Sequence, residues 1–185
     1  GRRLVPSAQA KNTIEALVKS GAIDGDLAED WRRRLADETA VKELRAKAER
    51  GDGEAMYVLG LWYQLGRNGL TKDMAQARAW FERSAAARDP RGMAGFGSCL
   101  LNGYGGPKNT SLGWVYITDA AHLGSNLGAY RLGWAFSEGD HGLPKDPVRA
   151  RYWLKKVVDG ECAHKHLSNE ASLAEAARWL RELDG

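Results

Sequence analysis

Apolar residues recur along much of the chain at intervals of three, four and seven or eight positions, with polar residues between them. This is the spacing of side chains on one face of an α-helix. Two such stretches follow each other between residues 55 and 86, and a polar turn that contains glycine separates them. The pattern predicts a pair of helices, with apolar positions at Ala55, Leu59, and Trp62 or Tyr63 in the first and at Ala77, Trp80 and Ala85 in the second.

The same pattern of helix, turn and helix occurs three times. The segments AMYVLGLWYQLG, GMAGFGSCLLNG and GAYRLGWAFSEG occupy residues 55–66, 92–103 and 128–139. Their internal glycines lie at 60, 97 and 133 and their final glycines at 66, 103 and 139, so both sets are spaced by 37 and then 36 residues. The agreement continues into GLTKDMAQARAWF and GLPKDPVRARYWL, which begin at residues 69 and 142. A period of this length predicts a stacked array, because one helix pair cannot bury its apolar face alone.

Residues that start and stop helices stand at fixed places in the repeat. Gly66 follows the first helix and is expected to end it. Asp73 and Asp146 precede the second helices, where a short carboxylate caps free backbone N–H groups, and Pro147 suits the first helical position. Asn109 takes the place of the aspartate in the middle copy, so the sequence predicts a cap less strongly there.

Gly60 is unusual, because an interior glycine costs a helix about 0.5–1 kcal/mol relative to alanine. Its recurrence at Gly97 and Gly133 indicates a contact that every repeat uses. Without a Cβ atom at this position, a neighbouring helix can approach closely, and packing an aromatic ring outweighs the loss of helix propensity. We therefore predict that Gly60 makes room for the helix that carries Trp80, and that the other two glycines do the same for its counterparts.

These residues resemble the Sel-1-like repeat family, whose pattern is close to A-x-Y-x-L-G-x-x-Y-x-x-G, then G-x-x-x-D, then A-x-x-W-x-x-x-A-A. The first copy matches at Ala55, Tyr57, Leu59, Gly60, Tyr63, Gly66, Asp73, Ala77, Trp80 and Ala85. The third copy matches at Gly128, Tyr130, Leu132, Gly133, Phe136, Gly139, Asp146, Ala150 and Trp153. The middle copy departs at Ala94, Asn109 and Tyr116. The resemblance implies an all-α fold, a right-handed α-solenoid (superhelix) of stacked antiparallel helix pairs that is similar to TPR arrays.

The repeat pattern also divides the chain. We expect repeat 1 at residues 51–87, repeat 2 at 88–123 and repeat 3 at 124–160, with N-terminal capping helices at 21–50 and a C-terminal capping helix at 161–185. Ala48 and Gly51 match the end of a second helix, at Ala121 and Gly124. In the last part, Ala176 and Trp179 take the places of Ala77 and Trp80.

Residues 1–20 are open to two interpretations. The stretch LVPSAQAKNTIE resembles the closing segment of a U-box, and Leu4, Val5, Pro6, Ile14 and Glu15 carry the resemblance. Ser7 and Ala10 depart from that pattern, and the alternative is a leading helix that is capped after a proline. The resemblance implies that the intact protein is a U-box ubiquitin ligase, whose surface for the ubiquitin-conjugating enzyme lies upstream of residue 1.

The composition is that of a folded globular protein, with 43% hydrophobic and 28% charged residues among 185. A net charge of +3 gives no electrostatic case for nucleic acid, which needs a concentrated basic surface. No apolar run reaches the roughly 20 residues of a membrane span. The start lacks the apolar core of a signal peptide, and it lacks an initiator Met. We therefore expect a cytoplasmic, monomeric part of a longer protein that does not insert into membranes.

Few residues suggest chemistry. Cys162, His164 and His166 lie close together, but two histidines at i and i+2 point to different sides of a helix, and Cys162 with His166 gives only two ligands. Asp73 and Asp146 each precede a predicted helix, so they are interpreted as helix caps rather than as a catalytic acid–base pair. The glycine-rich segment 103–109 lacks the spacing of a phosphate-binding loop. We predict no catalytic residue, no metal and no cofactor, although a metal-dependent enzyme is the third class considered.

Residues that vary between the copies, while the core positions repeat, are candidates for contact with a partner. Trp80, Trp153 and Trp179 recur at one position and are predicted to be core. On the first helices, which form the concave surface of a solenoid, the candidate partner-binding residues are Leu61, Gln64, Leu65, Leu101, Asn102, Arg131, Trp134, Ser137 and Glu138. The resulting hypothesis is a non-enzymatic adaptor that binds a protein or peptide in a concave groove. The alternative is the substrate-recruiting region of a U-box ubiquitin ligase.

Overall fold

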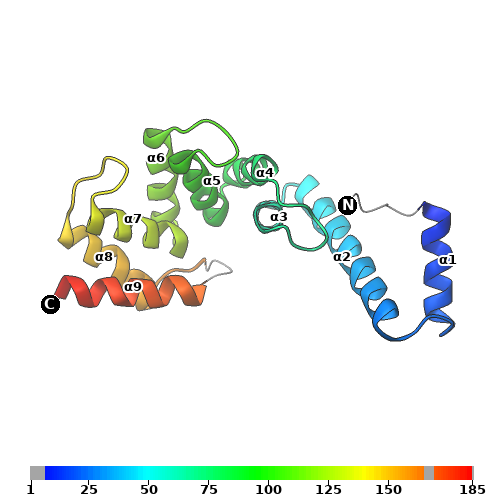
Figure 1. Ribbon diagram of the computed structural model, residues 1–185. Coiled ribbons are helices and arrows are strands. Elements are labelled where there is room, and N and C mark those ends of the chain that lie inside the picture. Colours follow the sequence, from blue (N-terminus) through cyan, green and yellow to red (C-terminus); the bar gives the residue numbers. More distant parts are fainter. Residues whose placement is uncertain (1–6, 165–168, 185) are drawn as a thin grey trace.

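The computed structural model describes residues 7–164 and 169–184, and these residues form nine α-helices and no β-strand (Figure 1). The predicted all-α class is therefore confirmed. The helices are α1 (Ala8–Lys19), α2 (Gly25–Glu49), α3 (Gly53–Leu65), α4 (Met74–Ala86), α5 (Pro90–Asn102), α6 (Thr110–His122), α7 (Asn126–Glu138), α8 (Pro147–Val158) and α9 (Asn169–Asp184).

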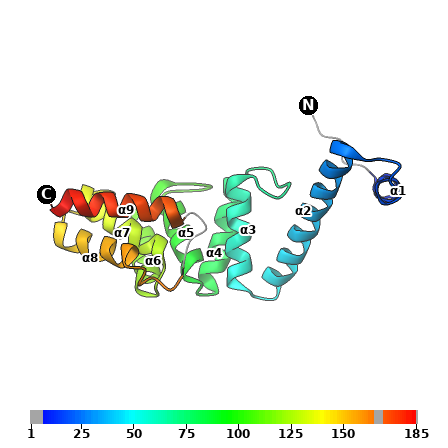
Figure 2. The same cartoon turned by 90° about the horizontal axis from the view of Figure 1, so that it is seen from below.

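The helices from α3 to α9 stack in a row, and α1 and α2 project from one end of it (Figures 1 and 2). Each helix from α2 onward packs against the next one along the chain. The first helices of successive repeats, α3, α5 and α7, also touch one another. The pairs α3/α4, α5/α6 and α7/α8 are the three sequence repeats, so the predicted solenoid of stacked helix pairs is confirmed.

The second helix of each repeat begins at a side-chain cap. Asp73 accepts hydrogen bonds from the backbone N–H groups of Ala75 and Gln76 at 2.9 and 3.0 Å. Asp146 accepts one from Arg149 at 3.0 Å, so both predicted caps are confirmed. Asn109 also caps its helix, through a bond from Leu112 N–H of 3.1 Å. The middle copy is thus capped as well, because the amide oxygen of asparagine accepts a backbone N–H as a carboxylate oxygen does.

The first helices are capped too, which the sequence analysis did not predict. Asp52, Asp89 and Ser125 hold these positions at the starts of α3, α5 and α7. All three first helices end at a glycine in the left-handed conformation, with φ of 67° at Gly66 and 74° at both of its counterparts. The predicted helix stop at Gly66 is therefore confirmed.

The three interior glycines are places of close contact, as predicted, but the tryptophan is not what fills them. A Cβ atom on Gly60 would lie 2.5 Å from the ring of Phe81. At Gly97 it would lie 2.8 Å from Ile117, and at Gly133 it would lie 2.6 Å from Leu154. Each occupant comes one residue after the position of Trp80, because neighbouring side chains on a helix point about 100° apart. The predicted close approach of the second helix at each glycine is therefore confirmed, and the side chain in contact is the neighbour of the tryptophan position: Phe81, Ile117 or Leu154.

The three tryptophans expected in the core differ in their burial. Trp153 is 7% exposed and belongs to the largest core cluster. Trp80 and Trp179 are only half-buried. Trp80 packs beside Trp62 against the cluster between α2 and α3, and the guanidinium of Arg83 lies 4.3 Å from its ring centroid. The core prediction is thus confirmed for Trp153 alone, because the other two lie where the array meets its end helices.

Replacing Gly60 with leucine should destabilise the protein more than replacing Gln64 with leucine one turn later. The leucine at Gly60 must displace the ring of Phe81, and overpacking of this kind costs about 1–3 kcal/mol. The measurement is urea unfolding followed by circular dichroism. Adding Phe81→Ala to Gly60→Leu should restore part of the loss, and equal stability of the two single variants would show that Gly60 is not a packing site.

The junction between repeats 1 and 2 is the tightest contact of the array. A Cβ atom on Gly92 of α5 would lie 2.0 Å from the hydroxyl oxygen of Ser84 on α4. That hydroxyl donates a hydrogen bond of 2.7 Å to the carbonyl of Gly53 at the start of α3. At the next junction, a Cβ atom on Gly128 would lie 2.8 Å from the backbone nitrogen of Ala121. At both junctions, the helix backbones of successive repeats are therefore so close that a side chain larger than glycine does not fit between them.

An ion-pair network fastens the first junction from the surface. Asp89 accepts hydrogen bonds from the backbone N–H groups of Arg91 and Gly92 and pairs with the Arg91 guanidinium at 2.8 Å. Arg91 also reaches Glu54 on α3 at 2.9 Å. Burial alone raises the pKa of Asp89, but the Arg91 and Gly92 hydrogen bonds and the Arg91 charge outweigh it, so this pKa lies below its ordinary value. The network holds α5 onto α3.

Both ends of the array are closed by single helices. The last turns of α2 occupy the place of a preceding second helix, since Ala48 is fully buried and Gly51 has a φ of 93°, close to the 85° of Gly124. The rest of α2 extends away from the array, and Leu27 is 76% exposed. At the other end, α9 packs against both α7 and α8, with Ala176 fully buried.

Candidate functional site

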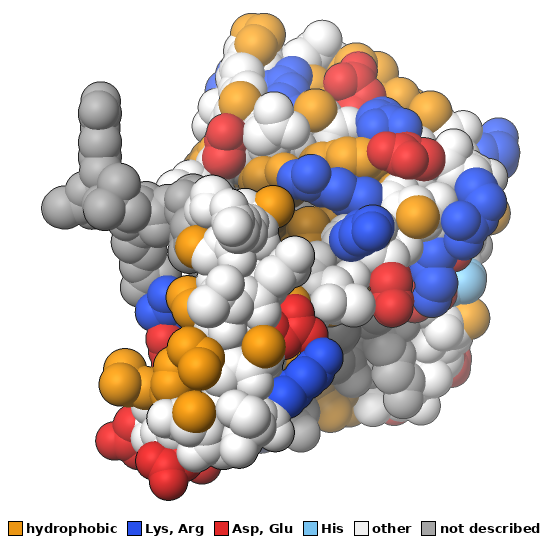
Figure 3. Space-filling model, turned by 90° about the vertical axis from the view of Figure 1, so that its right-hand side faces the viewer, with side chains coloured by type: hydrophobic (Ala, Val, Ile, Leu, Met, Phe, Trp, Pro, Cys, Tyr) orange, Lys and Arg blue, Asp and Glu red, His pale blue; other side chains and the backbone are white. Residues whose placement is uncertain are grey.

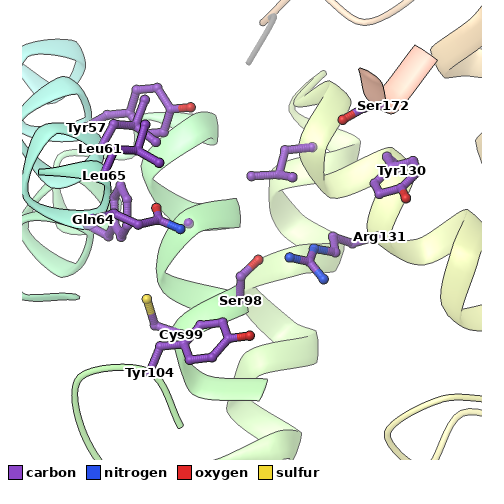
Figure 4. Close-up of a pocket in the computed structure, with 13 residues that line it drawn as sticks. Tyr57, Leu61, Gln64, Leu65, Ser98, Cys99, Tyr104, Tyr130, Arg131 and Ser172 are labelled. Carbon is purple, nitrogen blue, oxygen red and sulfur yellow. The ribbon is translucent and has the colours of Figure 1, made fainter. Parts of the chain in front are cut away.

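A hollow of 270 Å³ lies along the first helices of the three repeats (Figure 4). Its walls come mainly from α3, α5 and α7, and α9 closes one side through Ser172. We call this hollow the groove. The lining residues are Tyr57, Leu61, Gln64, Leu65, Phe81, Gly95, Ser98, Cys99, Tyr104, Leu127, Tyr130, Arg131 and Ser172.

A second hollow of 350 Å³ continues the groove toward the turn between α3 and α4. The two hollows share Gln64, Leu65 and Tyr104, and the second one adds Lys72 and Met74. The combined depression is therefore elongated, with Arg131 in one part and Lys72 in the other. This shape suits an extended chain better than a compact small molecule.

Four of the nine predicted partner-binding residues line the groove: Leu61, Gln64, Leu65 and Arg131. Leu65 is 51% exposed, whereas Leu61 is 4% exposed and forms part of the groove floor. The four residues are brought together because α3 and α7 face each other across α5 (Figure 4). Whether they contact a partner stays a prediction.

The other five predicted residues lie elsewhere. Leu101 is 2% exposed and packs against Gly113 on α6, so its side chain belongs to the core. Asn102 donates a hydrogen bond of 2.9 Å to the carbonyl of Ser98. Ser137 donates one of the same length to the carbonyl of Trp134, which is half-buried. Glu138 is exposed at the end of α7.

Several groove residues were missed from the sequence, and the reasons differ. Tyr57 and Tyr130 occupy a consensus position of the repeat, and that position gives no separate signal of a place in the groove. Tyr104 follows the helix-ending Gly103 and was read as part of a turn, yet it is 47% exposed beside Gln64 in the groove lining. The sequence signal was that an aromatic residue stands here, whereas Arg67 and Asp140 follow the corresponding glycines in the other two repeats. Ser172 comes from α9, whose place over the groove no local pattern indicates.

Of the groove-lining residues that the structure describes, Arg131 alone is charged. It extends from α7 toward Ser98 on α5 (Figure 4), and its Nε atom is buried without a hydrogen-bond partner among the described residues. The nearby Glu175 of α9 already accepts a hydrogen bond from the hydroxyl of Tyr130. Burial and this bond raise the pKa of Tyr130 to about 12. Among its described lining residues, the groove therefore carries a positive charge without a neutralising carboxylate.

The thiol that lines the groove is poorly suited to act as a nucleophile. Burial raises the pKa of the Cys99 thiol to about 11, although the charges of Arg78 and Arg131 act in the opposite direction. A thiol with so high a pKa holds very little thiolate at neutral pH. The hydroxyl of Ser98 donates to the carbonyl of Ala94 at 2.8 Å, which leaves its oxygen free to accept.

The segment considered for a metal site has a structural place. The backbone N–H of His164 donates to the carbonyl of Gly124 at 3.0 Å, and Asn126 N–H donates to the carbonyl of His164 at 3.1 Å. This pairing ties the segment after α8 to the start of repeat 3. Within residues 7–164 and 169–184, no group of three or more His, Cys, Asp or Glu side chains is placed to hold a metal ion. His166 lies outside the described residues.

The surface carries charges of both signs. Seen from the end that carries α1 and α2, Lys and Arg side chains gather near the middle and right of the molecule, with Asp and Glu side chains among them (Figure 3). None of the described helices is long and apolar enough to cross a bilayer.

Comparison with known proteins identifies the repeat. The family model described as Sel1 repeat matches residues 53–89, 90–125 and 127–157, which together are more than half of the chain. Among solved structures, a Sel1 repeat protein from Oxalobacter formigenes superposes with a TM-score of 0.60 at 24% identity, covering 80% of this chain and 56% of that one. A protective antigen of uropathogenic Escherichia coli with an SLR fold gives a TM-score of 0.55 at 25% identity, covering 96% and 38%.

Two curated relatives come from Arabidopsis thaliana. The ERAD-associated E3 ubiquitin-protein ligase component HRD3B is 34% identical over 104 residues, which are 56% of this chain and 16% of that protein. The component HRD3A is 36% identical over 62 residues, which are 34% of this chain and 9% of that protein. The chain thus spans a small part of the length of either relative.

Proposed function

Because the chain belongs to the Sel1 repeat family, we propose that it is a non-enzymatic scaffold that binds a partner protein or peptide on the concave side of its array. The groove along α3, α5 and α7 carries this proposal. It combines leucine and tyrosine side chains with an arginine, and tyrosine and arginine are enriched at the centres of protein interfaces. The expected cytoplasmic location and monomeric state stay predictions.

A second candidate function is recruitment of substrates or partners to a ubiquitin ligase. The similarity to HRD3B and HRD3A, which are ligase components, favours it. The U-box resemblance belongs to this candidate but gains no support, because the matched repeats begin at residue 53. Of the residues that carry it, Leu4, Val5 and Pro6 lie outside the described residues, while Ile14 and Glu15 are half-buried in α1.

Removing the exposed apolar surface of the groove should abolish partner capture. The variant is Leu65→Ser with Tyr104→Ser, two side chains that are 51% and 47% exposed. The matched control is Val148→Ser with Tyr152→Ser on α8, which are 74% and 54% exposed outside the groove lining. Each immobilised protein is incubated with a lysate of the source organism, and bound proteins are quantified by mass spectrometry.

We expect the groove variant to retain at least roughly tenfold less of the proteins that the wild type and the control both retain, since truncating interface anchors costs about 2 kcal/mol each. All three proteins should melt at similar temperatures. Equal retention by the groove variant would overturn the groove as the binding surface. Ubiquitin ligase subunits among the groove-dependent proteins would favour the second candidate.

A further inference from the structure

We propose that the groove selects an extended segment of a partner protein that presents an aspartate or glutamate side chain to Arg131, with an apolar side chain of the same segment against Leu65. This inference rests on the proposed function, since it specifies the chemistry of the partner at the same surface. Three observations carry it: the buried Nε atom of Arg131, the absence of acidic side chains among the described lining residues, and the shape of the groove.

The guanidinium of Arg131 is prepared for an anion. Its Nε atom is buried and makes no hydrogen bond to the part of the chain that the structure describes. A buried donor without a partner is costly, and rotation of the guanidinium toward an acceptor that a ligand supplies in the groove removes that cost. A carboxylate matches the guanidinium fork with two parallel hydrogen bonds, which no neutral acceptor does equally well.

The charge of the groove has one sign. Among the described residues, neither hollow has an Asp or Glu side chain in its lining, while Arg131 belongs to one hollow and Lys72 to the other. Glu175, on the neighbouring α9, is held by the hydroxyl of Tyr130. An acidic segment is therefore attracted along the whole depression, and a basic one is repelled.

The lining favours a carboxylate from a side chain over one from a chain terminus. Terminal carboxylates are held in proteins by nests of free backbone N–H groups. Here the walls are formed mainly by residues inside α3, α5 and α7, whose backbone N–H groups are already bonded along their helices. Side chains such as Arg131 and Gln64 are what the groove offers.

The shape of the groove explains why the ligand is a chain segment rather than a small acid. The two hollows join through Gln64, Leu65 and Tyr104, so a bound segment can run from Arg131 past these side chains toward Lys72. Leu65 and Tyr104 are about half exposed, at 51% and 47%, and present apolar surface to such a segment. An acidic and an apolar side chain a few residues apart would therefore both be used.

The test is selection of a phage-displayed library of random decapeptides against the wild-type chain and against Arg131→Gln. We expect peptides selected by the wild type to carry Asp or Glu at a fixed spacing from an apolar residue. A selected peptide should bind Arg131→Gln at least roughly tenfold more weakly, because a buried charge pair is lost. Changing the acidic residue of that peptide to its amide should weaken binding to the wild type equally, with no further loss in Arg131→Gln.

Two controls separate this effect from loss of fold or of net charge. Arg181→Gln on α9 removes one exposed positive charge outside the groove lining and should leave binding unchanged. Arg131→Lys keeps the charge without the fork and should bind with intermediate affinity. Melting curves should show that all the variants remain folded.

Each other result has a distinct meaning. Selected peptides without an acidic preference, or a preference that survives in Arg131→Gln, would overturn this inference while the proposed scaffold function stands. A preference for basic or nucleic-acid-like ligands would overturn it as well. Selection of no peptide at all, together with groove-independent capture of proteins, would overturn both the inference and the proposed function.

Discussion

Gly92→Leu is expected to unfold the middle of the array, with a loss of about 3 kcal/mol or more in the free energy of unfolding. A Cβ atom at this position would lie 2.0 Å from the hydroxyl oxygen and 2.3 Å from the Cβ of Ser84. Ser84 cannot move aside cheaply, since it is fully buried and hydrogen-bonded to the carbonyl of Gly53. The leucine therefore forces α4 and α5 apart. Thermal and urea unfolding, followed by circular dichroism, measure the loss.

The control is Ala79→Leu on the exposed side of α4, which should change stability by less than about 0.5 kcal/mol. Exchanging the small residues, with Ser84→Gly and Gly92→Ala in one chain, should recover stability relative to Gly92→Ala alone. A Gly92→Leu protein within about 1 kcal/mol of the wild type would show that the junction opens without cost, contrary to the packing described above.

Asp89→Asn should destabilise the protein by about 2–4 kcal/mol at pH 7, and the loss should shrink in acid. Asn keeps the cap of α5 but leaves the guanidinium of Arg91, which is 16% exposed, without its nearest carboxylate. The folded-state pKa of Asp89 lies below its ordinary value. Its contribution is therefore complete above the unfolded pKa of about 4 and is lost as the pH falls through the folded pKa.

Urea unfolding at pH 7, 5, 4 and 3 measures this dependence. The stability curves of the wild type and Asp89→Asn should converge toward the acid end, because the wild-type carboxyl is then protonated too. Asp73→Asn is the matched cap control: its helix start is exposed, and asparagine caps as well as aspartate, so the loss should stay below about 0.5 kcal/mol. A difference between wild type and Asp89→Asn that is the same at every pH would exclude the ion pair as its cause.

The fold could be predicted from the sequence because the signals repeat. Gly60 and its two counterparts, the helix stops such as Gly66, and the caps at Asp73 and Asp146 are local features, and each copy supports the others. The side chain that packs against Gly60 could not be identified from the sequence, because Trp80 and Phe81 are both large and are adjacent in the chain. Only the rotation of α4 about its axis decides between them.

The groove was predicted in part for a related reason. First helices line it, as expected, so Leu65 and Arg131 were found from their variation between copies. Tyr57 was missed because its side chain both occupies a consensus position of the repeat and lines the groove. Ser172 was missed because the docking of α9 depends on contacts far apart in the sequence. The Nε atom of Arg131, which has no partner among the described residues, is likewise a property of the folded chain alone.

The glycine junctions have a consequence for the groove. Gly92 lies against Ser84, and Gly128 lies against the backbone of Ala121, so the distance between successive repeats is set by helix backbones in contact. Rotation of side chains cannot widen this spacing, and the separation of α3 from α7 is fixed accordingly. The spacing of the groove walls is therefore set by the backbone, and we expect the proposed ligand to be selected by the order of its side chains rather than by how far it pushes the helices apart.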